Sequence, residues 1–434
     1  MKQLTRLFIP ICLETLFYML SGMVDTLMLS AVGDYAVGAV GTANSYIGIF
    51  IIMFSIISSG MVSVMTRNIG AGRPGVAYQA RQLGLLFNAV AGVLMAVFLF
   101  SGAGAILRMV GIADALYEPA LIYLKIVGGG CILNAVIPIF SSYLRAFGYT
   151  KQPLYATIVG NIANFVMNAV FLFVLHKGVA GVAAATVISK ILNLCIVLYF
   201  SHKLISAKNS TERIANKTVL GQIVKVGLPS ACETALYNVA MMLVIRFLNQ
   251  MDAEGLNVTA RSYTATISNF SYCVGAALAQ ANAIMTGWHI GAGELEECDR
   301  GTKRAAFVGV CVAVCMETAI VLGSGFIMPL FTDNPEMTAL VRKLLAIDIV
   351  LEIGRVTNLV FGQALKTSGD AVFPAVIAAV FMFVFAVGGT WLFGISMGLM
   401  AVGAYIGLAS DECVRAVGMV WRWKTGKWRT KKLV

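Results

Sequence analysis

Residues 10–29 read PICLETLFYMLSGMVDTLML, an apolar run that contains two carboxylates, Glu14 and Asp25. Its first part is matched by PSACETALY at residues 229–237, where Pro, Glu, Thr and Tyr recur at an offset of 219. About three helical turns separate Glu14 from Asp25, so both would lie on one face. A carboxylate inside a membrane is costly and usually functional. The stretch therefore predicts a membrane helix, a duplicated chain and a functional site.

The composition is that of a membrane protein, because 59% of the 434 residues are hydrophobic and only 12% are charged. Soluble domains carry roughly 25% charged residues. Apolar runs of about 20 residues, the length that spans a bilayer as a helix, recur along the chain. No cleavable signal peptide is expected, since the first run continues without a cleavage site. The predicted spans are residues 7–30, 40–65, 83–107, 120–143, 153–175, 179–201, 221–248, 258–286, 304–330, 340–364, 372–393 and 399–422.

Charge sets the expected orientation. Basic residues collect in the loops on one side of the spans and acidic residues on the other, which by the positive-inside rule makes both termini cytoplasmic. The net charge of +11 follows this asymmetry, so we expect no nucleic-acid partner. Trp421, Trp423 and Trp428 lie among the Lys and Arg of the C-terminal stretch WRWKTGKWRTKKLV (421–434). That pattern is typical of an anchor on anionic lipid.

Ordered matches at a nearly constant offset indicate a duplication. MTRNIGAG (65–72) matches MTGWHIGAG (285–293), LRAFGYTKQP (144–153) matches LKTSGDAVFP (365–374), and GVAGVAAA (178–185) resembles GLMAVGAY (398–405). Six spans in each repeat give parallel repeats with one orientation. The predicted fold is an all-α integral membrane protein with twelve transmembrane helices. Its predicted parts are an N-lobe (1–203), a cytoplasmic linker (204–218), a C-lobe (219–423) and a basic cytoplasmic tail (424–434).

The repeat separates the two carboxylates of the opening stretch. Glu14 recurs as Glu233, whereas the counterpart of Asp25 at the same offset is Val244. An unrepeated carboxylate in a span favours a cation or proton site at Asp25. The repeated pair could brace equivalent helices or could carry protons, and the sequence leaves both readings open.

Polar residues in the fifth and sixth spans support a site at Asp25. Asn161, Asn164 and Asn168 fall on one helix face, and Thr186 lies in the next span. One carboxylate with amide and hydroxyl oxygens suits a small hard cation such as Na⁺, and it equally suits a protonatable Asp. The alternative is that these side chains join helices by hydrogen bonds, which is common in membranes.

The tenth span carries a second polar face with Asp348, Glu352, Arg355 and Asn358. Glu352 and Arg355 are three residues apart and can form an ion pair, which lowers the cost of burying each charge. These residues have no counterparts in the first half. Either a structural salt bridge or a group that couples or binds substrate would explain them.

Several of these stretches together resemble one family. VDTLML (24–29), LRAFGYTKQP, GNIANFVMNAVFLF (160–173) and GVAGVAAATVISK (178–190), in twelve spans, are similar to multidrug and toxic compound extrusion (MATE) transporters of the MOP flippase superfamily. The resemblance implies a bacterial plasma-membrane exporter. Such an exporter uses a Na⁺ or H⁺ gradient to expel organic, often cationic, compounds by alternating access.

The resemblance also implies roles for particular residues. Asp25, Asn164, Asn168 and Thr186 match the N-lobe cation site of one branch, in which an Asp stands at the position of Asn168. Pro10 matches a proline proposed to bend the first helix. Another branch has a carboxylate at the position that aligns with Arg355, one turn after Glu352. A third branch has the motif P-x-x-x-E in both lobes, and this motif is present here at Glu14 and Glu233.

Other functions are less compatible with the sequence. A flippase for lipid-linked oligosaccharides, from the same superfamily, would favour more basic residues within the spans than the mainly acidic ones seen, although Arg355 keeps it open. An enzyme is not expected, because H-E-x-x-H and G-x-S-x-G are absent. A channel is disfavoured by the duplication and the lack of a filter. We expect a monomer that needs no cofactor beyond the coupling ion, with small organic substrates and membrane lipids as partners.

Overall fold

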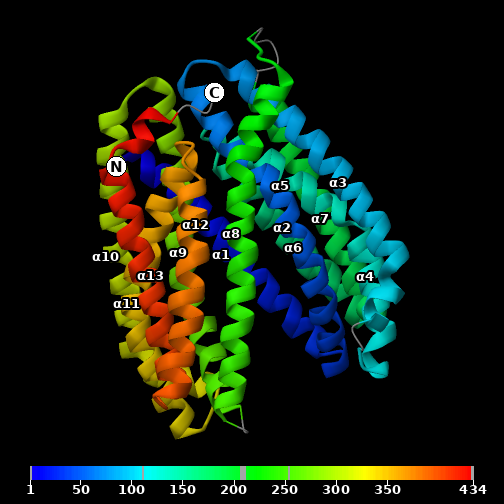
Figure 1. The fold of residues 1–434 in the computed structure, drawn as a ribbon. Coiled ribbons are helices and arrows are strands. Elements are labelled where there is room, and N and C mark those ends of the chain that lie inside the picture. The colour runs from blue at the N-terminus through cyan, green and yellow to red at the C-terminus, as the bar shows by residue number, and fades with distance from the viewer. Residues whose placement is uncertain (1, 110–111, 206–211, 253–254, 432–434) are drawn as a thin grey trace. The chain divides into compact units, whose positions relative to one another are not determined.

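A computed structural model describes residues 2–109, 112–205, 212–252 and 255–431, and every regular element in these ranges is helical (Figure 1). The first half contains α1 (Lys2–Ser30), α2 (Asp34–Gly70), α3 (Pro74–Met109), α4 (Asp114–Gly129), α5 (Cys131–Ala146), α6 (Lys151–Ala169) and α7 (Gly178–Leu204). The second half contains α8 (Asn216–Met251), α9 (Leu256–Ala292), α10 (Leu295–Ile327), α11 (Pro335–Thr367), α12 (Val372–Phe381) and α13 (Met400–Lys424).

The prediction of twelve membrane-crossing helices is confirmed for the described part of the chain. Helices α4 and α5 form one bent span, and α12 continues as π-helical turns to Ser396. Nine of the twelve segments are long and apolar enough to cross a bilayer by composition alone. The other three, α9, α11 and α13, are also long, but polar residues interrupt their apolar runs.

One span is not straight. Residues 120–143 were predicted as a single helix, but α4 and α5 meet at Gly130 with a bend of 41°. Gly128, Gly129 and Gly130 are consecutive, and glycine weakens a helix because it costs more backbone entropy to order than other residues. A sharp bend at such a run has an identifiable local cause.

The chain forms two compact units. The first unit is residues 9–227, and the second unit is residues 228–434 together with residues 1–8. Both boundaries fall next to a proline inside a helix, Pro10 in α1 and Pro229 in α8. Proline removes a helical hydrogen bond and so favours a break in rigidity there. The predicted linker, 204–218, precedes the second boundary, and residues 206–211 lie outside the described part.

In the first unit, α3 packs against α2, α4 and α5, while α6 packs against α7. The closest approach joins α2 to the start of α8. A Cβ atom on Gly60 would lie 2.0 Å from the carbonyl oxygen of Ile223, and one on Gly227 would lie 1.8 Å from that of Ile56. Only glycine permits backbones to approach so closely, which is how membrane helices gain packing energy.

In the second unit, α11 is central and packs against α9, α10 and α13. Helix α13 also packs against the π-helical extension of α12. There a Cβ atom on Gly389 would lie 2.8 Å from the Cα of Gly407. The three polar helices α9, α11 and α13 therefore meet one another inside this unit.

The duplication is visible in the backbone. Each half has three turns that contain a glycine with a left-handed φ, and these glycines occupy equivalent positions in the two repeats. The equivalent pairs are Gly72 (73°) with Gly293 (79°), Gly148 (84°) with Gly369 (93°), and Gly178 (53°) with Gly398 (70°). Residues with a Cβ atom rarely adopt these angles. Both halves therefore use the same chain reversals at the same places.

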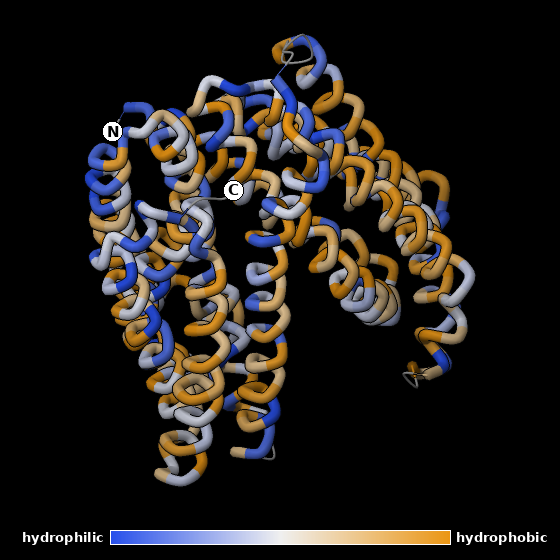
Figure 2. The backbone as a smooth tube through the Cα atoms, turned by 45° about the horizontal axis from the view of Figure 1, so that its top comes forward, coloured by the Kyte–Doolittle hydropathy of each residue, from blue (hydrophilic) through white to orange (hydrophobic). Residues whose placement is uncertain are grey.

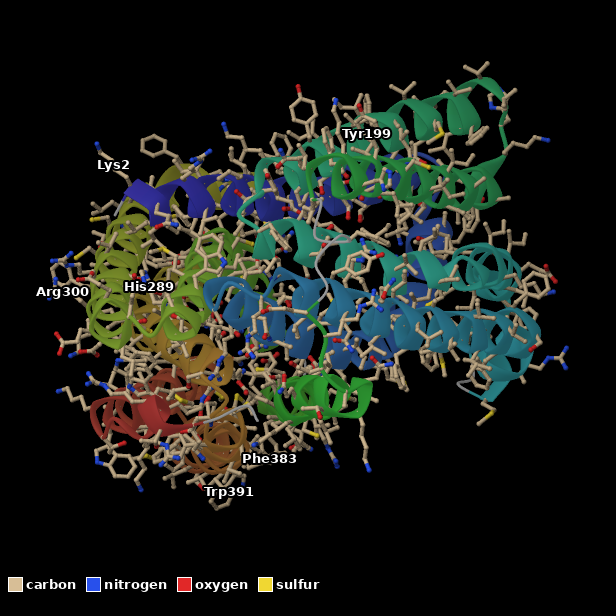
Figure 3. All side chains as sticks on the ribbon, turned by 90° about the horizontal axis from the view of Figure 1, so that it is seen from above. Lys2, Tyr199, His289, Arg300, Phe383 and Trp391 are labelled. Carbon is tan, nitrogen blue, oxygen red and sulfur yellow. The ribbon has the colours of Figure 1, made fainter. Side chains whose placement is uncertain are left out.

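The outer surface suits lipid. Hydrophobic residues run along most of each helix, and hydrophilic residues gather toward the ends (Figure 2). Phe383 and Trp391 point outward from the molecule (Figure 3), and Trp391 is 51% exposed. A further exposed stripe on α3 comprises Leu86, Phe87, Val90, Val93, Leu94, Val97 and Phe98. Apolar surface of this extent is expected where helices face a membrane.

The C-terminal tryptophans differ from their predicted role as a lipid anchor. Trp423 and Trp428 are buried and stack on each other with ring centroids 4.2 Å apart. The indole nitrogen of Trp423 donates to Asp299 at 2.7 Å, and that of Trp428 donates to the Trp423 carbonyl at 3.0 Å. These two rings pack the tail onto its own unit because their N–H groups find partners there. Only Trp421 remains exposed.

Candidate functional site

The structure brings Asp25, Asn168 and Asn164 together within the first unit. The amide nitrogen of Asn168, on α6, donates to Asp25 Oδ1, on α1, at 2.9 Å, and to Asn164 Oδ1 at 3.1 Å. Asn164 and Asn168 are buried. Among the described residues the Asn168 Oδ1 atom has no hydrogen-bond partner. A buried acceptor of this kind is an oxygen that a bound cation or a protonated carboxyl could use.

Helix α7 supplies the other side of this cluster. Ser189 Oγ accepts a 3.5 Å hydrogen bond from Asn164. Thr186 lies one turn earlier and donates its hydroxyl proton to the carbonyl of Val182 at 2.9 Å, so its oxygen stays available as an acceptor. The hydroxyl of Tyr123, from α4, lies against Thr186. The four residues predicted at the cation site therefore come from α1, α6 and α7.

Asn161 has a different role from its two neighbours. It lies on α6 with Asn164 and Asn168, but its amide donates to the main-chain carbonyl of Phe17 at 2.9 Å. It therefore joins α6 to α1 through the backbone and supplies no side-chain group to Asp25. This is the helix-joining role that the sequence left open for asparagines.

The sequence interpretation missed Lys190. This lysine lies on α7 one turn after Thr186, and its ammonium donates to Asn134 Oδ1 at 2.8 Å. It is joined to the Asp25 cluster through its neighbour Ser189, which bonds Asn164, and no ion pair joins it to Asp25 directly. The signal was present in GVAGVAAATVISK, which ends in a lysine inside an apolar run. An intramembrane lysine is as informative as an intramembrane aspartate.

Each repeat contains one equivalent ion pair at the P-x-x-x-E motif. Glu14 bonds Arg145, from α5, at 2.5 Å, and Glu233 bonds Lys366, from α11, at 2.8 Å. Arg145 and Lys366 occupy matching positions in LRAFG and LKTSG. In both repeats, therefore, the first helix is tied to the end of the fourth span. All four side chains are mostly buried.

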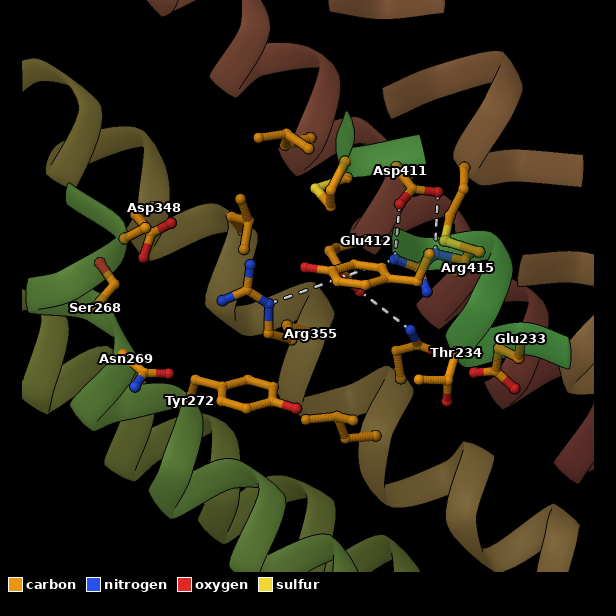
Figure 4. Close-up of a pocket in the computed structure, with 18 of the residues that line it drawn as sticks. Glu233, Thr234, Ser268, Asn269, Tyr272, Asp348, Arg355, Asp411, Glu412 and Arg415 are labelled. Atoms are coloured by element: carbon orange, nitrogen blue, oxygen red, sulfur yellow. Dashed lines mark hydrogen bonds and ion pairs between the residues drawn. The ribbon is translucent and has the colours of Figure 1, made fainter. Parts of the chain in front are cut away.

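The second unit contains a cavity of about 470 Å³ between α8, α9, α11 and α13 (Figure 4). Asp348, Arg355 and Asn358 line it from α11, as the predicted polar face suggested. Further lining residues include Glu233, Tyr237, Arg261, Tyr272, Tyr405, Asp411, Glu412 and Arg415. The cavity is therefore both charged and aromatic.

An ion-pair network forms one wall of this cavity. Arg355 pairs with Glu352, as their spacing predicted, and its Nε atom lies 3.5 Å from Glu412 Oε1. Arg415 pairs with Glu412 at 2.9 Å and with Asp411 at 2.7 Å. Glu412 is thus held between two arginines. The sequence interpretation missed the α13 residues, although charges inside the predicted span 399–422 were the available signal.

Two buried carboxylates nearby form no ion pair with any residue that the structure describes. Glu317, on α10, is fully buried, and neither of its oxygens reaches a hydrogen-bond donor among the described residues. Asp348 is 3% exposed, and its Oδ2 atom is likewise unbonded there. The two act electrostatically on each other. Unsatisfied buried carboxylates are costly and call for a proton, water or cation.

The counterpart of Asp25 confirms that the two sites are not copies. Val244 is fully buried in an apolar cluster of the second unit with Leu248 and Leu344. No group of three or more His, Cys, Asp or Glu in the described residues could hold a metal ion. Among the described residues, the Asp25 site contains one carboxylate and several neutral oxygens.

Twelve helices in two parallel repeats, with polar sites buried inside each unit, define a secondary-transporter architecture. The chain belongs to the MatE family, whose sequence profile matches residues 10–170 and 229–392. The two matched segments begin 219 residues apart, which is the offset of the repeat. The chain is a transporter and not an enzyme, because members of this family are transporters.

Two related proteins also support membership of a transporter family. The chain is 32% identical to an uncharacterized transporter, YisQ, of Bacillus subtilis, over 97% of this chain and 94% of the relative. It is 20% identical to the probable multidrug resistance protein NorM of Thermotoga maritima, over 100% and 94%.

Solved structures share the fold. An outward-facing multidrug resistance MATE transporter of the MOP superfamily matches with a TM-score of 0.85, at 21% identity, over 99% of this chain and 97% of that one. A Pyrococcus furiosus MOP superfamily transporter, described as having a binding pocket of reverse polarity, matches with a TM-score of 0.84, at 20% identity, over 99% and 97%.

Proposed function

We propose that this MATE transporter exports small organic, mainly cationic, compounds in exchange for Na⁺ or H⁺ that enters at Asp25. The observation that carries the proposal is the hydrogen bond between Asp25 and Asn168 in a buried cluster that the second repeat lacks. When a cation or proton neutralises Asp25, this contact changes, and with it the packing of α1 against α6. Alternating access of the two units then couples ion entry to substrate release.

The polar residues of the Asp25 site have separate roles in this proposal. Asp25 binds the ion, and Asn164, Asn168 and Thr186 offer neutral oxygens to it. Pro10 gives α1 a point at which it can bend. Arg355, which lines the cavity of the second unit, would contact substrate, and Glu352, fully buried and paired with Arg355, would transmit its presence, while Glu14 and Glu233 hold each repeat together.

The test uses purified protein in liposomes with a fluorescent organic cation. A Na⁺ gradient and a pH gradient are imposed separately, and wild type is compared with Asp25→Asn. Asp114→Asn is the matched control, because Asp114 is exposed at the start of α4. We expect gradient-driven transport in wild type and Asp114→Asn, and its loss in Asp25→Asn. Undiminished transport by Asp25→Asn would exclude this mechanism.

A lipid-linked oligosaccharide flippase is the second candidate function. The observation in its favour is the number of basic side chains within the helices, since Arg415 and Lys190 add to Arg355. Basic groups suit a pyrophosphate-linked substrate. If neither gradient moved the dye, flipping of such a lipid in the same liposomes would be the next measurement.

We also propose that the protein works as a monomer in the bacterial plasma membrane, with both termini in the cytoplasm. The charge asymmetry of the loops supports this orientation. No nucleic acid and no cofactor other than the coupling ion is required. Protease accessibility of tags at each terminus, in intact cells and in inverted vesicles, tests the orientation.

A further inference from the structure

Lys190 is the second charged side chain of the Asp25 site. It shares one face of α7 with Thr186, four residues before it, and it directly follows Ser189, which bonds Asn164. Its ammonium is fixed by Asn134 Oδ1 at 2.8 Å. The site therefore contains a built-in cation as well as a carboxylate.

The charges around this pair are few. Helix α4 contributes the Tyr123 hydroxyl and α5 contributes the Cys131 thiol, both uncharged at neutral pH. Helices α2 and α6 contribute amides, from Asn44 and from the two asparagines that line Asp25, and α1 contributes the Tyr18 hydroxyl. Among these described residues, Asp25 and Lys190 are the two that carry charge when Asp25 is ionised, and those two charges balance each other.

We infer that Lys190 is the residue that selects the coupling ion, because its ammonium excludes Na⁺ from Asp25 and leaves the proton as the ion that binds there. This inference rests on the cation-coupled function proposed above. Na⁺ is held only by electrostatic attraction to several oxygens, so a fixed positive charge nearby opposes it directly. A proton forms a covalent O–H bond with one carboxylate oxygen and needs no shell of ligands. It therefore tolerates the same repulsion.

The magnitude of the effect can be bounded. A unit charge several ångströms away in a protein interior changes the affinity of a monovalent ion by on the order of tenfold to a hundredfold. The site has one carboxylate and no second anion to offset this repulsion. Removal of the ammonium should therefore create measurable Na⁺ binding at Asp25.

The test measures binding of radioactive Na⁺ to purified protein at equilibrium, at neutral pH and constant ionic strength. Wild type should show no saturable binding up to about 0.15 M, the physiological ionic strength. Lys190→Gln should gain one site at least about tenfold tighter. The double variant Lys190→Gln with Asp25→Asn should lose that site, and Lys190→Arg, which keeps the charge, should behave as wild type. Lys125→Gln, an exposed lysine on α4, is the matched control.

Each alternative outcome overturns the inference. Saturable millimolar Na⁺ binding by wild type at Asp25 would show that the ammonium excludes nothing. No gain in Lys190→Gln, in a folded protein, would show that another feature excludes Na⁺. A gain in Lys190→Arg would show that charge is not the cause. If Lys190→Gln does not fold, Lys190→Met replaces it as the uncharged variant.

The binding measurement separates this inference from the proposed function. It needs no substrate, so it holds even if no organic cation is transported. If Lys190→Gln binds Na⁺ at Asp25 but no gradient drives export in any variant, the proposed function fails and the inference stands. If wild type exports a dye on a pH gradient, Lys190→Gln should gain export on a Na⁺ gradient.

Discussion

In the first unit one carboxylate, Asp25, lies among amides and faces a single lysine that does not touch it. In the second unit three carboxylates, Glu352, Asp411 and Glu412, are held by two arginines in direct contact. A lone carboxylate changes its whole charge when one ion binds, whereas a closed network resists such a change. Under the proposed function, the residues that the repeats do not share would therefore differ in task, because Asp25 would change charge when the ion binds and the network of the second unit would not.

The two repeats share the features that hold their helices in place. The pairs Glu14 with Arg145 and Glu233 with Lys366 occupy equivalent places, and so do the left-handed glycines at the chain reversals. Conserved geometry in both halves is the expected result when one fold is used twice. The difference between the sites, and not their common frame, is what the following experiments test.

The largest effect on stability is expected from Arg355→Met. The change leaves Glu352 and Glu412 buried with less positive charge to compensate them. Removing one partner of a buried ion pair costs about 3–5 kcal/mol, so the free energy of unfolding should fall by that amount. Thermal melting of the purified protein in detergent measures it. Arg355→Lys keeps the charge and should lose less, and an unchanged melting temperature in Arg355→Met would contradict a closed network.

Glu317→Met should raise the free energy of unfolding, whereas Arg355→Met should lower it. Glu317 is buried, and neither of its oxygens has a hydrogen-bond partner among the described residues, so its burial opposes folding. An apolar side chain of similar length removes that penalty, and we expect stability to rise by about 1–3 kcal/mol. The same melting measurement applies. A lower melting temperature would mean that Glu317 has a partner in the working protein, such as a bound cation or ordered water.

The sequence predicted features that depend on local spacing. The spans and the repeat follow from hydropathy and self-similarity, and the pair Glu352–Arg355 follows from its three-residue separation on one helix. The grouping of Asp25 with Asn168 was also predicted, from the chemistry of polar residues within spans and from the family resemblance, although 143 residues separate them.

Features that depend on tertiary contact were not predictable from local pattern. Nothing near Glu14 in the sequence points to Arg145, which lies 131 residues away. The role of Trp428 depends on a stacking partner, Trp423, and on a reversal of the chain at Gly426. Lys190 and Glu317, by contrast, could have been found, because each is a charge inside an apolar span.

Equal effects are expected when the repeated ion pairs are broken. Glu14→Gln and Glu233→Gln each remove a mostly buried charge-assisted bond, and each should cost about 1–2 kcal/mol. The double change Glu14→Arg with Arg145→Glu should recover part of the first loss. Thermal melting of wild type and of the three variants checks this. A large effect on one side alone would show that the two pairs have diverged in role.

The smallest expected effect concerns a carboxylate outside the spans. Asp252 follows α8 and accepts backbone N–H bonds from Leu256 at 2.8 Å and from Asn257 at 3.0 Å. Burial raises the pKa of Asp252, but these bonds outweigh it, so the pKa falls below the ordinary value of 3.8. Since the folded pKa is the lower one, the ionised group stabilises the fold above pH 3.8. This stabilisation is lost as the pH falls through the folded value.

Asp252→Asn, which cannot ionise, isolates this contribution. The melting temperatures of wild type and variant should differ by a small, constant amount near neutral pH and converge below about pH 4. The difference in melting temperature is small because the Asp252 carboxylate is close to solvent, where charges are screened. A difference that grows on acidification would mean that the fold favours the protonated form of Asp252. In that case Asp252 would resemble the buried carboxylates Glu317 and Asp348 of its own unit and not the ion-pair network beside them.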